Sequence, residues 1–230
     1  MCHHATHFFA LAWFFDLIRS VDKFVILDHV QFEKQSWQQR NRIRNKQGEL
    51  VLSLAVQHEM GLERKINSVK LDYSRNSNFK HLESIKHSYS KSMNFEAIFP
   101  EIEFIFNQKH ALLIDLNIEL IKLGMKYLSI EKEFIYSSKI DVLGQRVEAL
   151  IDICNKVGAN KYLSPVGSKA YIDENNLFPS NNIELTYQLF KHPVYKQIGY
   201  HDFISHLSFI DYLFNTELNE VKKFGSFNTN

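Results

Sequence analysis

Hydrophobic and polar positions divide the chain into a first part with strand-like runs and a longer part with helical spacing. Phe24–Asp28 and Glu49–Gln57 are rich in Val, Leu, Ile and Phe, which predicts two strands. Ile66–Asp72 alternates apolar and polar residues, and this pattern predicts a further strand with one face in water. The first part of the chain is therefore expected to form sheet.

From Asn78 onward, apolar residues recur at the spacing of one helix face. A break near Gln108 divides the apolar segment Phe95–Leu128 into two predicted helices, and Pro100 predicts a restart or a first-turn position. The remaining segments alternate between predicted strands at Glu133–Ser138, Lys161–Ser164 and Asn182–Phe190 and predicted helices at Val142–Ala159 and Ser205–Leu218.

This alternation predicts an α/β fold, a single domain with a mainly parallel or mixed sheet flanked by helices. Residues 1–221 are expected to form that domain, because no linker-like or low-complexity segment interrupts them. Residues 222–230 are mostly polar and are expected to form a flexible C-terminal tail.

Charge and cysteine content narrow the range of partners. Lys and Arg number 27 against 26 Asp and Glu, a net charge of +1, so no global field attracts nucleic acid or an anionic membrane. An anionic ligand must be held locally. Cys2 and Cys154 fit a reduced compartment without disulfides. The apolar run Phe8–Phe15 is too short for a membrane span and lacks the flanks of a signal peptide, so we expect a cytoplasmic protein.

Catalytic signatures with fixed spacing are missing from the sequence. It contains no GxxxxGK[ST], GxGxxG, GxSxG or HExxH, which weakens several enzyme classes without excluding them. Cys2, His3, His4 and His7 are potential metal ligands, but they crowd one chain end and lack the two-cluster spacing of structural zinc sites. We therefore expect no bound metal, and the cofactor remains open.

The segment after Asp28 concentrates polar and aromatic chemistry at the end of a predicted strand, where ligand sites of open α/β sheets form. Asp28 offers an acceptor or base, Arg40 and Arg42 forked donors, and Trp37 a flat apolar face. Two interpretations remain open. The segment forms one wall of a polar ligand site, or it is a solvated hairpin whose charges pair with each other.

The stretch VDKFVILDHVQFEKQSWQQRNRI resembles the signature of the WbqC-like proteins. The resemblance continues through FKHLESIKHSYSK, DLNIELIKLG, the serines of FIYSSKI, ANKYLSPVGSKAYI, HPVYKQ and LSFIDYLFN, in the expected order. It implies ligand-facing roles for matching positions. These are Asp28 and His81 as catalytic candidates, and Gln31, Lys34, Trp37, Asn41, Arg42, Ser138, Ser164, Gly167, Tyr195, Gln197 and Asp211 as substrate-binding candidates.

The resemblance also implies a bacterial protein of surface-polysaccharide (O-antigen) biosynthesis. Its implied role is modification of a nucleotide-linked amino sugar by acyl or aminoacyl transfer from an acyl donor. The alternative is a non-catalytic or divergent binding partner of a polysaccharide assembly system. Near the N-terminus the family reads close to QPxYFPWxGYF, whereas this chain has Ala5 and Thr6 for Gln-Pro, Ala10 for the second proline and Trp13 for glycine. Because glycine and proline at such positions fix a turn, these departures support the alternative.

Overall fold

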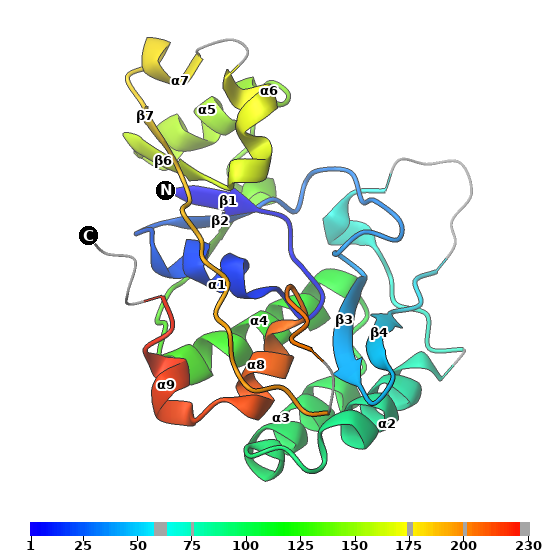
Figure 1. The fold of residues 1–230 in the computed structure, drawn as a ribbon. Helices are drawn as coiled ribbons and strands as arrows, with labels where there is room; N and C mark the ends of the chain where they lie inside the picture. The colour runs from blue at the N-terminus through cyan, green and yellow to red at the C-terminus, as the bar shows by residue number, and fades with distance from the viewer. Residues whose placement is uncertain (58–63, 75, 174–176, 200–201, 226–230) are drawn as a thin grey trace.

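The computed structural model describes residues 1–57, 64–74, 76–173, 177–199 and 202–225, which form a mixed α/β domain (Figure 1). The strands are β1 (Cys2–His4), β2 (Phe24–Ile26), β3 (Arg40–Asn45), β4 (Gly48–Ser53), β5 (Phe134–Tyr136), β6 (Lys161–Ser164) and β7 (Glu184–Tyr187). The helices are α1 (Ala12–Arg19), α2 (Ser77–Tyr89), α3 (Phe95–Asn107), α4 (Leu113–Leu128), α5 (Val147–Lys156), α6 (Lys169–Asp173), α7 (Leu177–Ser180), α8 (Phe209–Asn215) and α9 (Leu218–Lys222). Short 3-10 turns are η1 (Ile66–Ser68), η2 (Ser137–Lys139) and η3 (Val166–Ser168).

Two parallel sheets meet at the first residue of the chain. One sheet has the order β1-β2-β5, and the other pairs β6 with β7. The Met1 amino group donates to the Lys161 carbonyl at 2.8 Å, and the Leu163 amide donates to the Met1 carbonyl at 2.8 Å. In a parallel pair of strands, a residue hydrogen-bonds to the two residues that flank its partner on the other strand, as Met1 does with Lys161 and Leu163. The combined order is therefore β5-β2-β1-β6-β7.

Alternate residues of these strands face two separate hydrophobic clusters. Cys2, Phe24 and Ile26 pack with α1, α3, α4 and α8, whereas Met1 and Val25 pack with α5, α6 and α7. Figure 1 shows the same arrangement, with α5, α6 and α7 on one side of the strands and α1 and α4 on the other. Burial on both faces explains why β2 is a continuous apolar run.

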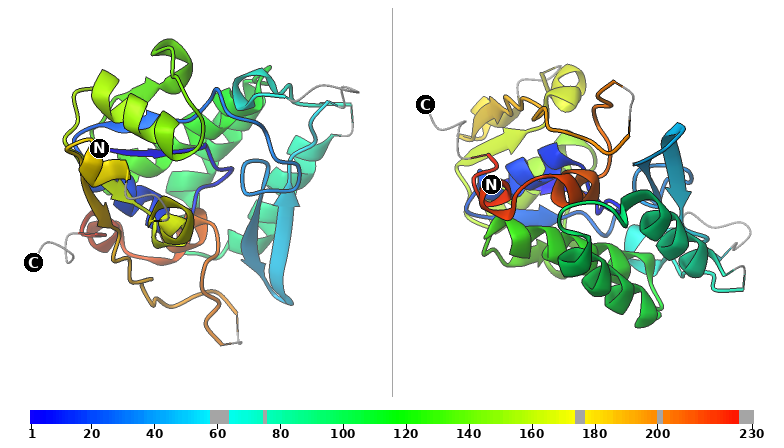
Figure 2. Two further views of the ribbon diagram at one scale, coloured as in Figure 1. Left: turned by 90° about the horizontal axis from the view of Figure 1, so that it is seen from above. Right: turned by 60° about the horizontal axis from the view of Figure 1, so that its bottom comes forward.

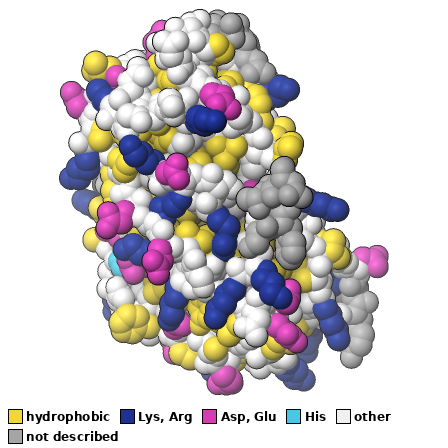
Figure 3. Space-filling model, turned by 90° about the vertical axis from the view of Figure 1, so that its left-hand side faces the viewer, with side chains coloured by type: hydrophobic (Ala, Val, Ile, Leu, Met, Phe, Trp, Pro, Cys, Tyr) yellow, Lys and Arg dark blue, Asp and Glu magenta, His cyan; other side chains and the backbone are white. Residues whose placement is uncertain are grey.

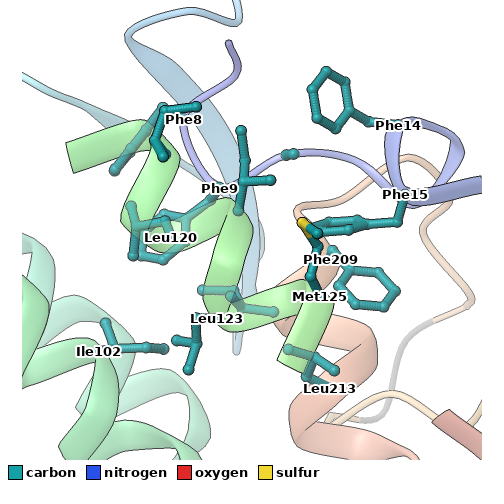
Figure 4. Close-up of a cluster of buried hydrophobic side chains, with 14 of the residues drawn as sticks. Phe8, Phe9, Phe14, Phe15, Ile102, Leu120, Leu123, Met125, Phe209 and Leu213 are labelled. Carbon is teal, nitrogen blue, oxygen red and sulfur yellow. The ribbon is translucent and has the colours of Figure 1, made fainter. Parts of the chain in front are cut away.

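α4 is the centre of the larger cluster (Figure 4). Phe8, Phe9, Phe15 and Phe209 gather around it from the segment after β1, from α1 and from α8. The antiparallel hairpin β3–β4 lies apart from the parallel sheet, beside α2 (Figures 1 and 2). The sequence pattern alone had not separated this hairpin from the main sheet.

The α/β class and the parallel sheet are confirmed, as are strands at β2, β5, β6 and β7 and the division of α3 from α4. The strand predicted at Ile66–Asp72 is wrong: it contains η1 and isolated bridges at Lys70 and Leu71. The restart at Pro100 is also wrong, because Pro100 lies inside α3. The single last helix divides in two at Thr216, whose backbone is extended.

The C-terminal tail expected at 222–230 begins differently. Lys222 ends α9, Phe224 is buried in the larger cluster, and residues 226–230 lie outside the described residues. None of the described helices is both long enough and apolar enough to cross a bilayer. Acidic and basic side chains are interspersed over the face in Figure 3, in keeping with a net charge of +1.

Candidate functional site

Polar side chains follow the strands at one edge of the parallel sheet. His4 ends β1 and Ser164 ends β6, Ser137 and Gln188 come directly after β5 and β7, and Asp28 is the second residue after β2. β2 lies on one side of β1 and β6 on the other, so the strand order reverses between β1 and β6. Ligands of open α/β sheets bind in the crevice at such a point, outside the carboxyl ends of the strands.

The segment that leaves β1 at this point, residues 5–11, is here called the β1 loop. Phe9 within it has a left-handed backbone with φ of 46°. Asn41 Nδ2 donates to the carbonyls of Phe8 at 3.0 Å and Phe9 at 2.8 Å, and Ser208 Oγ donates to the Phe9 carbonyl at 2.9 Å. A left-handed backbone at a bulky residue costs about 1–3 kcal/mol and persists only where its surroundings fix it. Asn41 and Ser208 supply that fixation.

A second anchor holds the start of the β1 loop. Asn117 on α4 donates from Nδ2 to the Gln38 carbonyl at 2.8 Å and to Thr6 Oγ1 at 3.4 Å. Three buried side-chain atoms around this anchor, His7 Nδ1, Gln38 Oε1 and Asn117 Oδ1, have no hydrogen-bond partner within the described residues. Buried polar atoms without partners are uncommon and often mark functional positions.

Two imidazoles lie together at the rim. The rings of His4 and His7 are 4.7 Å apart, and Trp13 lies 5.1 Å from His4 and 5.5 Å from His7. Burial lowers the pKa of both histidines, that of His7 well below its ordinary value. Both imidazoles are therefore neutral near pH 7. His4 Nδ1 donates to the Ala5 carbonyl at 3.0 Å, which leaves Nε2 as an acceptor, whereas His7 can donate one hydrogen bond and accept another.

The histidines and cysteine at the start of the chain do not converge on one point. His3 stacks on Tyr162 with ring centroids 5.2 Å apart and hydrogen-bonds its hydroxyl, whereas His4 and His7 contact Trp13. Cys2 is fully buried in the cluster on the α1 side of the sheet. Across the described ranges, no three His, Cys, Asp or Glu residues are grouped so as to hold a metal ion.

Asp28, a catalytic candidate, is fixed between β2 and β5. Its carboxylate accepts from Ser137 Oγ at 3.0 Å, the Ser138 amide at 2.8 Å and Ser138 Oγ at 2.5 Å. Asp28 is 4% exposed, and the Ser137 hydroxyl also contacts His29 Nδ1 at 2.6 Å. Ser138, a substrate-binding candidate, is thus brought to Asp28 as part of one hydrogen-bonded unit.

His81, the second catalytic candidate, lies in a different neighbourhood. It projects from α2 against Phe8 and Phe106, with ring centroids at 5.9 and 6.4 Å. Burial lowers its pKa to about 4, partly opposed by a hydrogen bond to the Ser53 backbone. No hydrogen bond of Asp28 or His81 within the described residues joins the two.

Five other candidates belong to the hairpin and the segment leading into it. Arg42 pairs with Glu49 at 2.8 Å and lies over the Trp37 ring, 5.4 Å from its centroid. Lys34 is exposed, and Gln31 is exposed with its backbone bridged to Lys65. Arg42 therefore pairs within the hairpin, as the solvated interpretation described, while Asn41 beside it is buried and holds the β1 loop.

Tyr195, Gln197 and Asp211 form one buried network. Asp211 accepts from Tyr195 OH at 2.7 Å, Gln197 Nε2 at 3.0 Å and Tyr89 OH at 2.7 Å. Arg44 Nη1 donates to Gln197 Oε1 at 2.7 Å. Burial raises the pKa of Asp211, and the donors from Tyr195, Tyr89 and Gln197 oppose that rise. The network joins α8 to α2 and β3.

Ser164 and Gly167 lie in the turn after β6. Ser164 is fully buried and donates to the Pro165 carbonyl at 3.3 Å. A Cβ added at Gly167 would meet nothing within 4 Å, so no close backbone approach requires glycine there. Sequence reasoning missed Asn117, Ser208, Tyr89 and Arg44. The first three stand inside segments that carry the family resemblance, DLNIELIKLG, LSFIDYLFN and FKHLESIKHSYSK, which was the available signal.

Comparisons with known proteins agree with the sequence resemblance. The sequence model described as the WbqC-like protein family matches residues 6–223. An uncharacterized protein of Mycobacterium tuberculosis is 29% identical over 204 residues, which cover 88% of this chain and 87% of that protein. No solved structure matches the chain.

Proposed function

Because the chain belongs to the WbqC-like protein family, we propose that it acts in bacterial surface-polysaccharide (O-antigen) biosynthesis in the cytoplasm. It binds a nucleotide-linked amino sugar at the sheet edge formed by the β1 loop and the end of β6. There it transfers an acyl or aminoacyl group from an activated donor to the sugar amine.

One observation carries the placement at the β1 loop. Three residues from separate segments of the chain hold this loop, and its left-handed Phe9, through hydrogen bonds. They are Asn41, Asn117 and Ser208. The loop lies where the strand order reverses, and buried polar atoms that have no partner within the described residues lie in the loop, at His7, and at its anchor, on Gln38 and Asn117. Strain that several groups maintain at a sheet crevice supports a binding role.

The chemical roles follow from the surroundings of each group. Neutral His4 can accept a hydrogen bond from a ligand hydroxyl, and neutral His7 can donate one to a hydroxyl or phosphate oxygen. Asp28 and His81 remain the predicted proton acceptors for the attacking amine. The three donors on Asp28 and the apolar enclosure of His81 favour positioning over proton transfer. This observation favours the second candidate function, a non-catalytic binding partner of the assembly system.

The test is a thermal-shift titration of the protein with nucleotide-linked amino sugars, comparing wild type, His4→Ala and Arg42→Ala. A ligand at about 100 times its Kd stabilises the native state by about 2.7 kcal/mol. We expect His4→Ala to lose the shift, while Arg42→Ala, on the hairpin, keeps it. Loss only in Arg42→Ala would move the site to the hairpin, and no shift with any sugar would refute the proposal.

A second assay separates the two candidate functions. Acyl-CoA or aminoacyl donors are added with the stabilising sugar, and the sugar mass is followed by mass spectrometry. Transfer adds the acyl mass to the amine as the donor loses it. Ligand binding without any mass change, for every donor class, would support the binding partner over the transferase.

A further inference from the structure

A cavity of about 690 Å³ opens on the side of the molecule away from α5, α6 and α7. Four segments that are distant in sequence line it: the β3–β4 turn, the α2–α3 turn, residues 196–199 and the end of α8. At the bottom of Figure 1 the connection between β7 and α8 reaches the tip of the hairpin and the ends of α2 and α3. The cavity shares no residue with the β1 loop.

Each of three of these segments contributes a lysine to the cavity: Lys46, Lys91 and Lys196. Within the described residues, Lys91 and Lys196 take part in no ion pair. The cavity between α3 and α4 is different, because its Lys122 pairs with Glu119 and its Lys126 with Glu101. With a net charge of only +1 on the chain, Lys91 and Lys196 on one hollow form a local field that the whole molecule lacks.

The wall that carries Lys196 is rigidly supported. Gln197 beside it accepts from Arg44 at 2.7 Å and donates to Asp211 at 3.0 Å and to the Ile204 carbonyl at 2.9 Å. Gly199 has φ of 106° and lies against Arg44, with 3.6 Å from an added Cβ to Nε. The guanidinium of Arg44, a residue that is 1% exposed, therefore lies behind the cavity wall and holds Gln197 in place, while the Asp211 carboxylate in the same network offsets its charge.

We propose that this cavity binds a small molecule bearing a diphosphate group. Ammonium groups act as point charges toward phosphate oxygens, and those of Lys91 and Lys196, on two separate segments around one space, suit an anion with more than one negative charge. Ser92 and Asn215, also in the lining, provide neutral polar groups for the remainder of the molecule. The volume is within the range of small-molecule sites, about 300–1,000 Å³.

The first experiment is isothermal titration of the full chain with inorganic pyrophosphate at low and at physiological salt. We expect saturable binding that weakens as salt rises, because the contacts are ionic. Lys91→Ala combined with Lys196→Ala should weaken binding by about tenfold or more, because it removes two ammonium groups that face the anion. The matched control, Lys122→Ala with Lys126→Ala, removes the same charge from the α3–α4 cavity and should leave affinity within about twofold.

Either of two results would overturn the proposal: no saturable binding of pyrophosphate, or equal weakening by both double variants. The source of the diphosphate is then identified by titrating UDP and by sedimentation with vesicles that contain a polyprenyl diphosphate. Tighter binding of UDP than of pyrophosphate assigns a nucleotide, and vesicle binding that the Lys91 and Lys196 substitutions abolish assigns a lipid head group.

Discussion

At the scale of single residues, several side chains that resemble ligand-binding positions of the family perform structural work. Asn41 was expected to face a ligand, yet both protons of its amide reach the carbonyls of Phe8 and Phe9. Asp211 collects three donors, and Asp28 accepts from both serines that follow β5. The family motifs therefore mark the supports of the sheet edge as well as its surface.

Asn41→Ala should lower the free energy of unfolding by about 2–4 kcal/mol, because it leaves the buried Phe8 carbonyl without a donor, removes one of the two donors to the Phe9 carbonyl and loosens the left-handed Phe9. Urea denaturation measures the loss. Arg42→Ala on the adjacent position removes a partly exposed ion pair, an exposed hydrogen bond to the His206 carbonyl and the contact with Trp37, and should cost about 1 kcal/mol. Equal losses in the two variants would contradict the role of Asn41 as the anchor of the β1 loop.

At the scale of elements, packing decides details that sequence periodicity does not contain. Gly124 in the middle of α4 is buried under Phe15 of α1. A Cβ at this position would lie 2.6 Å from Phe15 Cε1 and still nearer to Cζ. The glycine, which weakens an isolated helix, is the residue that allows α1 and the β1 loop to approach α4.

Gly124→Ala should therefore destabilise the protein by about 1–3 kcal/mol, although alanine in an open helix would gain about 1 kcal/mol. Adding Phe15→Leu should give a combined loss smaller than the sum of the single losses, which denaturant titration of the double-mutant cycle detects. Gly167→Ala, where an added Cβ meets nothing within 4 Å, is the matched control. A Gly124→Ala variant as stable as wild type would refute the close packing of these helices.

The same dependence on packing explains which elements were predictable. β2 is apolar on both faces, and β6 has apolar residues at its centre. α4 keeps one apolar stripe over its whole length. The local sequence pattern therefore identified all three elements. Ile66–Asp72 shows strand-like alternation, but its neighbours are single bridges to Ala55–Gln57 and Leu112, and without a continuous partner the segment turns as η1. Whether such a segment forms a strand depends on partners that are distant in the sequence, and the hydrophobic periodicity of the segment itself carries no information about those partners.

At the scale of the whole molecule, the sheet edge gathers residues that the sequence separates by more than a hundred positions. The strands that end just before Asp28 and at Ser164 were predictable from local pattern. The assembly around the β1 loop was not, because it depends on the order β5-β2-β1-β6-β7 and on Asn117 and Ser208 arriving from α4 and the start of α8. Long-range topology is absent from single-sequence patterns.

Burial of histidines on both sides of this sheet makes stability depend on pH. Burial lowers the pKa of His3 to about 3 and of His81 to about 4, and lowers that of His7 well below 6.5, the ordinary value. In the unfolded chain these imidazoles regain the ordinary value, so below pH 6.5 the unfolded state binds more protons. The stabilisation is therefore complete above pH 6.5 and is lost as pH falls toward 4.

We expect the free energy of unfolding to fall between pH 7 and pH 5, with each buried histidine contributing up to about 1.4 kcal/mol per pH unit. Urea titrations over this range measure the slope. His81→Gln should reduce the slope by up to about 1.4 kcal/mol per pH unit, which corresponds to one proton, because it removes one group that becomes charged only on unfolding. His87→Gln, an exposed position on the same helix, should leave the slope unchanged. A wild-type slope near zero, or one that His81→Gln does not alter, would show that His81 reaches water in the native state.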